Sequence, residues 1–391
     1  MLFTRGTRSL AIARRRVAFS LPPLKHAAKP PCSVVPAWTG IRAFHLEGLA
    51  LAPVVFGGLF VALWTWKCCM LVTFQNKIIY MPGIPPNARW ERIEDYANQC
   101  AGIKWREEIV RSKDGKDLAL CVADVQLGAE RGKQEPVNIY ILYFQGNASS
   151  TPPRLPDLSQ VLCIIKRQML SESRSYRLSF VCLSYRGYWT SSGRPTEKGL
   201  RLDAAAALNW VSQHHHNSHV ANAGEADSIS SPAEVLLWGQ SIGSGVATNL
   251  AAEYAMPNNC RLNSLVLETA FTSVRAMLEV LYPQKWLPYK YLWPFLRNHL
   301  DSWKNLDAIA ERYKNESHRP QLFFLEAAKD ELVPKAVSQQ LFDRSLQSGL
   351  ATERHAVTGA FHNDAVFRVE GRKAVAEFIS KRINEVTAKG P

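Results

Sequence analysis

Several short stretches of this chain are apolar at nearly every position, and this pattern limits the possible folds more than any other feature. The clearest stretch is Val137–Phe144 (VNIYILYF), which is rich in β-branched and aromatic residues. A strand is apolar throughout when both faces of its sheet are covered, as in parallel sheets. Segments with apolar residues at helical spacing follow most of these stretches. This alternation predicts an α/β fold with right-handed crossovers and a mostly parallel central sheet flanked by helices.

The predicted elements cover most of the chain after residue 74. Strands are expected after the Asp-Gly turn at 114–115 and at 137–144, 178–185, 235–238, 264–267, 321–326 and 354–357. Helices are expected at 199–213, 243–254, 335–346 and 372–386. Residues 217–231 are polar and small, which predicts a surface insertion. Residues 274–300 are rich in Trp, Tyr and Phe and predict a helical insertion over the sheet edge, either an acyl-binding lid or core packing.

The excess of positive charge is concentrated at the N-terminus. Residues 1–45 hold eight of the 47 Lys and Arg residues and no Asp or Glu, which leaves 39 basic against 34 acidic residues in the rest. No nucleic-acid partner is therefore expected for the folded part, because its charge is nearly balanced. An acid-free, Arg-rich start is typical of a mitochondrial presequence, with the tail of an ER-type or other signal anchor as the alternative.

An uncharged stretch of 19 residues at 48–66 follows this basic tail. At about 1.5 Å per residue, a helix of this length nearly crosses the ~30 Å hydrocarbon core of a membrane. Trp64 and Trp66 lie at one end, where interfacial aromatic residues are common. The sequence predicts a single transmembrane anchor, an extended lead-in at 74–86, and one α/β domain over 74–386. The eight cysteines are too few for a disulfide scaffold.

A five-residue motif between a predicted strand and a predicted helix gives the clearest chemical signal. Gly239-Gln240-Ser241-Ile242-Gly243 has the context of a nucleophile elbow, the Gly-x-Ser-x-Gly turn that lifts a serine above the sheet. Glycines are needed on both sides because the turn is too tight for side chains. The helix N-terminus then lies beside the developing oxyanion. We therefore predict Ser241 to be a nucleophile.

A serine nucleophile needs a histidine base and an acid that orients it, and in this context the chain order is serine, acid, histidine. Asp330 follows the strand expected at 321–326, and His362 follows the last expected strand. Both would lie at the carboxyl edge of the sheet, where open α/β sheets place their sites. Glu331 is a competing acid, and His355 is disfavoured because it lies within a predicted strand. Asp330 and His362 are the predicted partners.

The negative oxygen of a tetrahedral intermediate needs two N–H donors. Gln145-Gly146-Asn147 follows the strand Val137–Phe144, and the glycine allows a close approach of the backbone to substrate. We predict that the backbone amides of Asn147 and Ile242 form this oxyanion hole. No metal or organic cofactor is expected, because the histidine run at 214–216 lacks spaced carboxylate or cysteine partners.

Together these motifs resemble a known family. In chain order they are Gln145-Gly146-Asn147, Tyr185-Arg186-Gly187-Tyr188, Ser192-Gly193-Arg194-Pro195 with Glu197, Gly239-Gln240-Ser241-Ile242-Gly243, Phe271-Thr272-Ser273, Asp330-x-x-Val333-Pro334 and His362-Asn363-Asp364. This ordered set is similar to the α/β-hydrolase superfamily and, more narrowly, to the membrane-anchored abhydrolase-domain serine hydrolases of the bud-emergence type. The resemblance implies an α/β-hydrolase fold and a Ser-Asp-His triad at Ser241, Asp330 and His362.

Three positions depart from that family pattern. Gln145 stands where a histidine usually precedes the oxyanion glycine, Trp189 where glycine is frequent, and Phe361 where a smaller residue is common. The function expected is a membrane-anchored serine hydrolase that cleaves an ester or thioester of a lipid or acylated substrate. The alternative is a catalytically silent membrane scaffold or interaction protein with the same fold, since fold does not imply function.

Overall fold

The computed structural model describes residues 46–128, 136–223 and 231–388. The chain divides into two compact units, residues 1–58 and 59–391. Within the first unit, the described residues form the opening turns of helix α1 (Leu46–Ile79), whose remainder belongs to the second unit. The expected basic presequence at 1–45 lies outside the described residues.

Helix α1 contains the apolar segment Leu51–Ile79, which is long and apolar enough to cross a membrane and includes an 18-residue window with a mean hydropathy of 1.7. Its backbone kinks at Phe74, where φ is −101° and ψ is 15°. The extended lead-in expected at 74–86 is therefore wrong over its first six residues, which continue the helix. Gln75 exchanges hydrogen bonds with Phe295 and Arg297, and the Asn76 side-chain oxygen accepts from the Asn298 side chain at 2.7 Å. These bonds hold the last turns in place, and such contacts are not visible in the local sequence.

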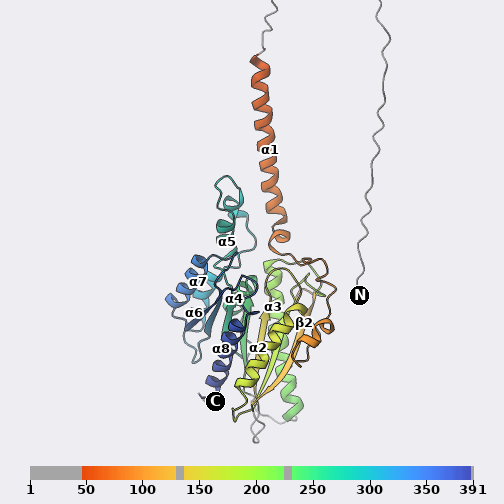
Figure 1. Cartoon of the computed structure of the whole chain (residues 1–391), viewed down its shortest axis with the longest axis vertical. Helices are drawn as coiled ribbons and strands as arrows, with labels where there is room; N and C mark the ends of the chain where they lie inside the picture. The colour runs from red at the N-terminus through yellow and green to blue at the C-terminus, as the bar shows by residue number, and fades with distance from the viewer. Residues whose placement is uncertain (1–45, 129–135, 224–230, 389–391) are drawn as a thin grey trace, which may run out of the picture. The chain divides into compact units, whose positions relative to one another are not determined.

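The second unit is built on an eight-stranded sheet in the order β1-β2-β4-β3-β5-β6-β7-β8 (Figure 1). Strand β2 pairs antiparallel with β1 and β4, and all other neighbours are parallel. The strands are β1 (Arg106–Arg111), β2 (Asp117–Leu127), β3 (Val137–Phe144), β4 (Tyr176–Leu183), β5 (Ala233–Gln240), β6 (Cys260–Glu268), β7 (Gln321–Ala327) and β8 (Thr352–Val357). The mostly parallel sheet predicted from the apolar stretches is confirmed.

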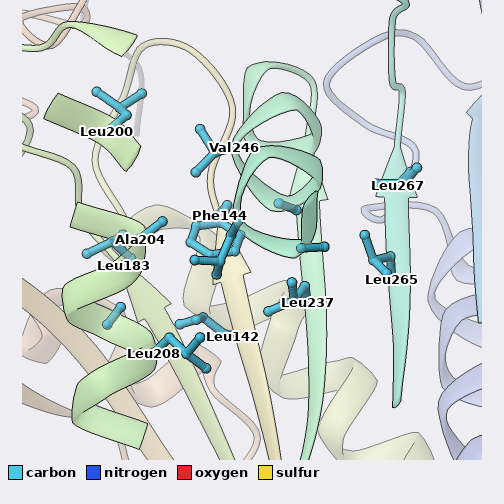
Figure 2. Packing of buried hydrophobic residues seen from close by; sticks show 14 of the residues in the cluster. Leu142, Phe144, Leu183, Leu200, Ala204, Leu208, Leu237, Val246, Leu265 and Leu267 are labelled. Carbon is cyan, nitrogen blue, oxygen red and sulfur yellow. The ribbon is translucent and has the colours of Figure 1, made fainter. Parts of the chain in front are cut away.

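Both faces of the sheet are covered by helices. One apolar cluster includes Leu142 and Phe144 of β3 together with residues of α3 (Glu197–Ala223), α4 (Ile242–Glu253), α6 (Ser302–Arg312) and α7 (Lys335–Gln347). Figure 2 shows part of this cluster between β3, β5, α3 and α4. The alternate residues Ile141 and Tyr143 face the other cluster, with α2 (Leu155–Gln168) and α8 (Val369–Ala388). This two-sided burial explains why β3 is apolar at nearly every position.

The structure adds elements that the sequence analysis did not predict, among them β1, α2 and α6. It also corrects the insertion expected at 217–231, because residues 217–223 belong to α3. The polar composition misleads there, because His219 makes a ring contact within the helix: its ring centroid lies 4.6 Å from that of His215. Tertiary packing of this kind overrides local propensity.

The aromatic-rich segment at 274–300 contains α5 (Val274–Leu281) and two 3-10 turns, Tyr289–Tyr291 and Trp293–Phe295. It follows β6 and precedes α6. In Figure 1 the part around α5 projects from the rest of the second unit.

Candidate active site

Ser241 occupies the turn between β5 and α4 in a strained conformation, with φ 53° and ψ −116°. Glycines on both sides make this turn possible. A Cβ atom on Gly239 would lie 2.2 Å from the carbonyl oxygen of Gly243, and one on Gly243 would lie 2.1 Å from that of Phe144. The Ser241 amide donates to the Glu268 carbonyl oxygen at the end of β6, at 2.8 Å. Local sterics and one bond to the next strand therefore fix the serine above the sheet.

The structure brings the three residues predicted as a triad together. Ser241 Oγ lies 2.9 Å from His362 Nε2, and His362 Nδ1 lies 2.9 and 3.0 Å from the two carboxylate oxygens of Asp330. The His362 and Asp330 side chains are only 4% and 9% exposed. This geometry lets the imidazole accept a proton from the serine while the carboxylate fixes its orientation.

The neighbouring acid, Glu331, has a different position. Its carboxylate accepts from the His362 backbone amide at 3.0 Å, while the ring contacts Asp330. The Asp330 carboxylate is itself held by the amides of Leu332 and Val333, at 2.9 and 2.7 Å. The other competing residue, His355, contacts Glu370 instead of the site. Glu331 thus holds the loop that carries His362.

The loop after β3 lies next to the elbow. A Cβ atom on Gly146 would lie 3.0 Å from the Gln240 side chain, so the two turns pack closely. As the first residue of α4, Ile242 has an amide without a carbonyl one turn back in the helix. The Asn147 side-chain oxygen accepts from the Met81 amide at 3.1 Å and from the Tyr188 hydroxyl at 3.1 Å, which ties this loop to the segment after α1.

Gln145, which replaces the histidine usual in the family, is buried. Its side-chain oxygen accepts from the Thr151 hydroxyl at 2.9 Å, and its backbone carbonyl accepts from the Tyr185 hydroxyl at 2.9 Å. Among the described residues its amide nitrogen has no partner. The glutamine therefore anchors the loop through its oxygens.

The other motifs that carry the resemblance mainly hold the scaffold. The buried Arg186 guanidinium pairs with Asp203 and Asp114, both at 2.7 Å, and hydrogen bonding to Arg186 lowers the pKa of the Asp114 carboxyl to about 2. Trp189 has a positive φ of 43°, which explains why glycine is frequent at this position. Burial of its ring and an indole bond to the Glu91 carbonyl oxygen, at 2.7 Å, offset that strain.

Glu268 is a residue of the site that the sequence analysis missed. Besides holding the Ser241 amide, it is fully buried and accepts from the Trp238 indole at 3.0 Å. Burial raises the pKa of this carboxyl, and nearby Arg154 acts in the opposite direction. Among the described residues its second carboxylate oxygen has no partner. The sequence does contain a signal for this residue, because Glu268 is an acidic residue directly after the apolar strand expected at 264–267.

The described residues contain no group of three or more His, Cys, Asp or Glu side chains arranged to hold a metal ion. His214 of α3 instead makes ring contacts with Tyr140 and Trp210.

Comparison with known proteins shows what the chain is similar to. No protein-family profile matches the chain. Protein bem46 of Schizosaccharomyces pombe is 28% identical over 311 residues, 80% of this chain and 87% of that protein. Lysophosphatidylserine lipase ABHD12 of Danio rerio is 29% identical over 175 residues, 43% of this chain and 40% of that protein. The crystal structure of an alpha-beta hydrolase from Vibrio vulnificus aligns with a TM-score of 0.51 at 17% identity, covering 80% of this chain and 92% of that one.

A mostly parallel eight-stranded sheet with a serine in a strained turn after a central strand is the α/β-hydrolase fold, and the Vibrio vulnificus structure shares that fold. In sequence, the chain is similar to bem46 and ABHD12, which supports the resemblance to the abhydrolase-domain proteins of the bud-emergence type.

Proposed function

We propose that the chain is a membrane-anchored serine hydrolase that cleaves an ester or thioester. The observation that carries the proposal is the pair of contacts made by one buried imidazole, to Ser241 Oγ at 2.9 Å and to the Asp330 carboxylate at 2.9 Å. A structural histidine rarely joins a strained serine to a buried acid, because such an arrangement costs free energy without improving packing.

In the proposed reaction, Ser241 Oγ attacks the acyl carbonyl carbon while His362 Nε2 takes the hydroxyl proton. Asp330 keeps the imidazole in the correct tautomer and stabilises the imidazolium that forms. The bond between the acyl carbon and the oxygen or sulfur of the leaving group then breaks, and His362 gives its proton to that atom. Water attacks the acyl-enzyme with His362 as the base, which releases the acid and restores the serine.

The backbone amides of Asn147 and Ile242 are the proposed donors to the tetrahedral oxyanion. The position of Ile242 at the N-terminus of the twelve-residue helix α4 supports this role, because the free amides and the helix dipole there favour negative charge. For Asn147, the support is that its side chain is engaged with Met81 and Tyr188, which fixes the loop that carries its amide.

The proposed substrate is a lipid or an acylated molecule, which two observations outside the triad support. The apolar helix α1 supports a single-pass anchor, which would keep the domain beside a bilayer. A related protein from Danio rerio is named as a lysophosphatidylserine lipase, which supports the acyl-lipid class. The basic N-terminal tail supports a mitochondrial membrane, with the ER or another endomembrane as the alternative.

Labelling by a fluorophosphonate probe tests this function on the detergent-solubilised full chain. The wild type should be labelled and Ser241→Ala should not, while Ser173→Ala, at an exposed loop serine, should be labelled like the wild type. Hydrolysis of acyl lipids by the wild type alone would then establish turnover. A folded wild type that neither reacts with the probe nor hydrolyses any acyl substrate would contradict the proposal and favour the silent scaffold.

A further inference from the structure

Exposed aromatic side chains gather on one segment of the hydrolase domain, residues 274–297, here called the cap. Leu281, Trp286, Tyr291, Trp293 and Phe295 are 45%, 73%, 55%, 45% and 60% exposed. Among the described residues from 90 onward, the other large exposed apolar side chains occur one at a time along the chain. Scattered residues of that kind are normal, whereas a contiguous exposed apolar patch usually marks an interaction surface.

The cap is joined to the end of α1, within the same compact unit. The Arg297 guanidinium donates to the carbonyl oxygens of Val72 and Thr73, at 3.0 and 3.2 Å. The Gln75 side chain donates to the Phe295 carbonyl oxygen at 3.1 Å and accepts from the Arg297 amide at 2.7 Å. These bonds satisfy the polar groups on both sides and hold the cap against the apolar helix.

A shallow groove between the two elements is almost entirely apolar. Its lining comes from Leu71, Val72, Gln75, Ile78 and Ile79 of α1 and from Leu278, Tyr282, Tyr289, Leu292, Phe295 and Leu296 of the cap. Its volume of about 70 Å³ is far below the roughly 300–1,000 Å³ of ordinary ligand pockets. The groove is therefore too small for a bound lipid, and it extends the apolar surface of α1 onto the cap.

Basic residues outnumber acidic residues in the cap. It contains four basic residues, Arg275, Lys285, Lys290 and Arg297, and one acidic residue, Glu279. Arg275 lies 4.1 Å from the Trp293 ring centroid, and Lys67 of α1 lies 5.6 Å from that of Tyr289. Aromatic rings with basic side chains around them are typical of membrane interfaces, where the rings meet acyl chains and the cations meet phosphates.

We propose that the cap is a second membrane contact, whose exposed aromatic face enters the interface of the bilayer that holds α1. The partner is a phospholipid surface, and the basic residues favour anionic headgroups. This inference rests on the membrane anchoring by α1 proposed above. The cap begins six residues after Glu268, whose carbonyl holds the Ser241 amide, so a lipid-bound cap would keep the nucleophile elbow close to membrane-embedded acyl substrates.

Photocrosslinking from lipids tests the proposal on the full chain. The protein is reconstituted into phosphatidylcholine–phosphatidylserine vesicles that contain a phospholipid with a diazirine in its acyl chain, and adducts are located by mass spectrometry. Adducts are expected within 51–79 and on the cap. Trp286→Glu should reduce the cap adducts about tenfold, because a carboxylate is costly in this zone, and should leave those of α1 unchanged. The matched control is Trp90→Glu, at a tryptophan that is 82% exposed outside the cap, and it should change neither.

The outcomes separate the two proposals. Adducts on α1 without adducts on the cap would overturn the membrane contact of the cap and leave the anchor intact. A lack of adducts on both would overturn both. Equal labelling of the cap and the Trp90 region would overturn the proposal as non-specific contact. A cap protected from aqueous labelling reagents but free of lipid adducts would also overturn it, and would indicate a protein partner. Circular dichroism of each variant confirms that it is folded.

Discussion

The nucleophile elbow and the cap follow neighbouring strands, β5 and β6, yet they differ in what fixes their structure. At the elbow, backbone atoms approach so closely that a single Cβ atom on Gly239 or Gly243 has no room. At the cap, large rings project from the domain and several are about half exposed or more. Steric contacts and hydrogen bonds determine the conformation of the elbow. The exposed rings of the cap, in contrast, are suited to contact with something outside the domain. Substitutions at the elbow should therefore impair chemistry or folding, and those at the cap should mainly change what the surface contacts.

The largest effect is expected from the two neighbouring acids that hold His362. Asp330→Asn keeps the shape of the side chain but stabilises the wrong imidazole tautomer, so kcat should fall about 10⁴-fold. Glu331→Gln keeps an oxygen that can accept from the His362 amide, so kcat should fall less than about tenfold. Hydrolysis of a short-chain nitrophenyl ester by the full chain in detergent measures both. Similar losses in the two variants would show that Asp330 has no special role.

The next effect tests the sterics of the elbow. Gly243→Ala places a Cβ atom 2.1 Å from the Phe144 carbonyl oxygen, and we expect a loss of about 3 kcal/mol in the free energy of unfolding together with loss of labelling at Ser241. Gly83→Ala is the matched control, because nothing lies within 4 Å of the added atom, and it should change that free energy by less than about 1 kcal/mol. Denaturant unfolding measures both. A fully stable Gly243→Ala protein would contradict the sterically fixed elbow.

A smaller, pH-dependent effect is expected at Glu268. Because burial raises the pKa of its carboxyl in the folded chain, the folded state holds this proton more tightly than the unfolded state does. The free energy of unfolding therefore falls progressively as the pH rises above the ordinary glutamate pKa. At lower pH the carboxyl is protonated in both states and does not change this free energy. Glu268→Gln keeps an acceptor for the Trp238 indole and removes the titration. Its Tm should exceed that of the wild type increasingly as the pH rises from acid to neutral. Parallel Tm curves would refute the prediction.

Features that depend on local sterics and local apolar patterns could be predicted from the sequence. The apolar stretch of β3 and the glycines around Ser241 express physical requirements that are local in the chain, so the sheet and the elbow could be predicted. Asp330 and His362 were proposed from chain order, and the structure places them within hydrogen-bonding distance of each other. They remain predictions until activity is measured.

What sequence reasoning missed depends on contacts between distant residues. The last turns of α1 are held by bonds from Gln75 to residues some 220 positions later. The extension of α3 is accompanied by a ring contact between His215 and His219. Glu268 belongs to the site because its backbone carbonyl, at the end of the neighbouring strand β6, accepts from the Ser241 amide. None of these pairings leaves a periodic pattern in the local sequence.

The smallest effect is expected at the cap, and it completes the contrast with the elbow. Trp286→Ala removes a ring that is 73% exposed, so the free energy of unfolding of the detergent-solubilised chain should change by less than about 0.5 kcal/mol. Trp189→Ala removes a ring of equal size that is 2% exposed and hydrogen-bonded, and should cost about 3 kcal/mol or more. Denaturant titration of both proteins makes the comparison. If Trp286→Ala proved as destabilising as Trp189→Ala, the cap would be part of the packed core, and its exposed rings would need no membrane to account for them.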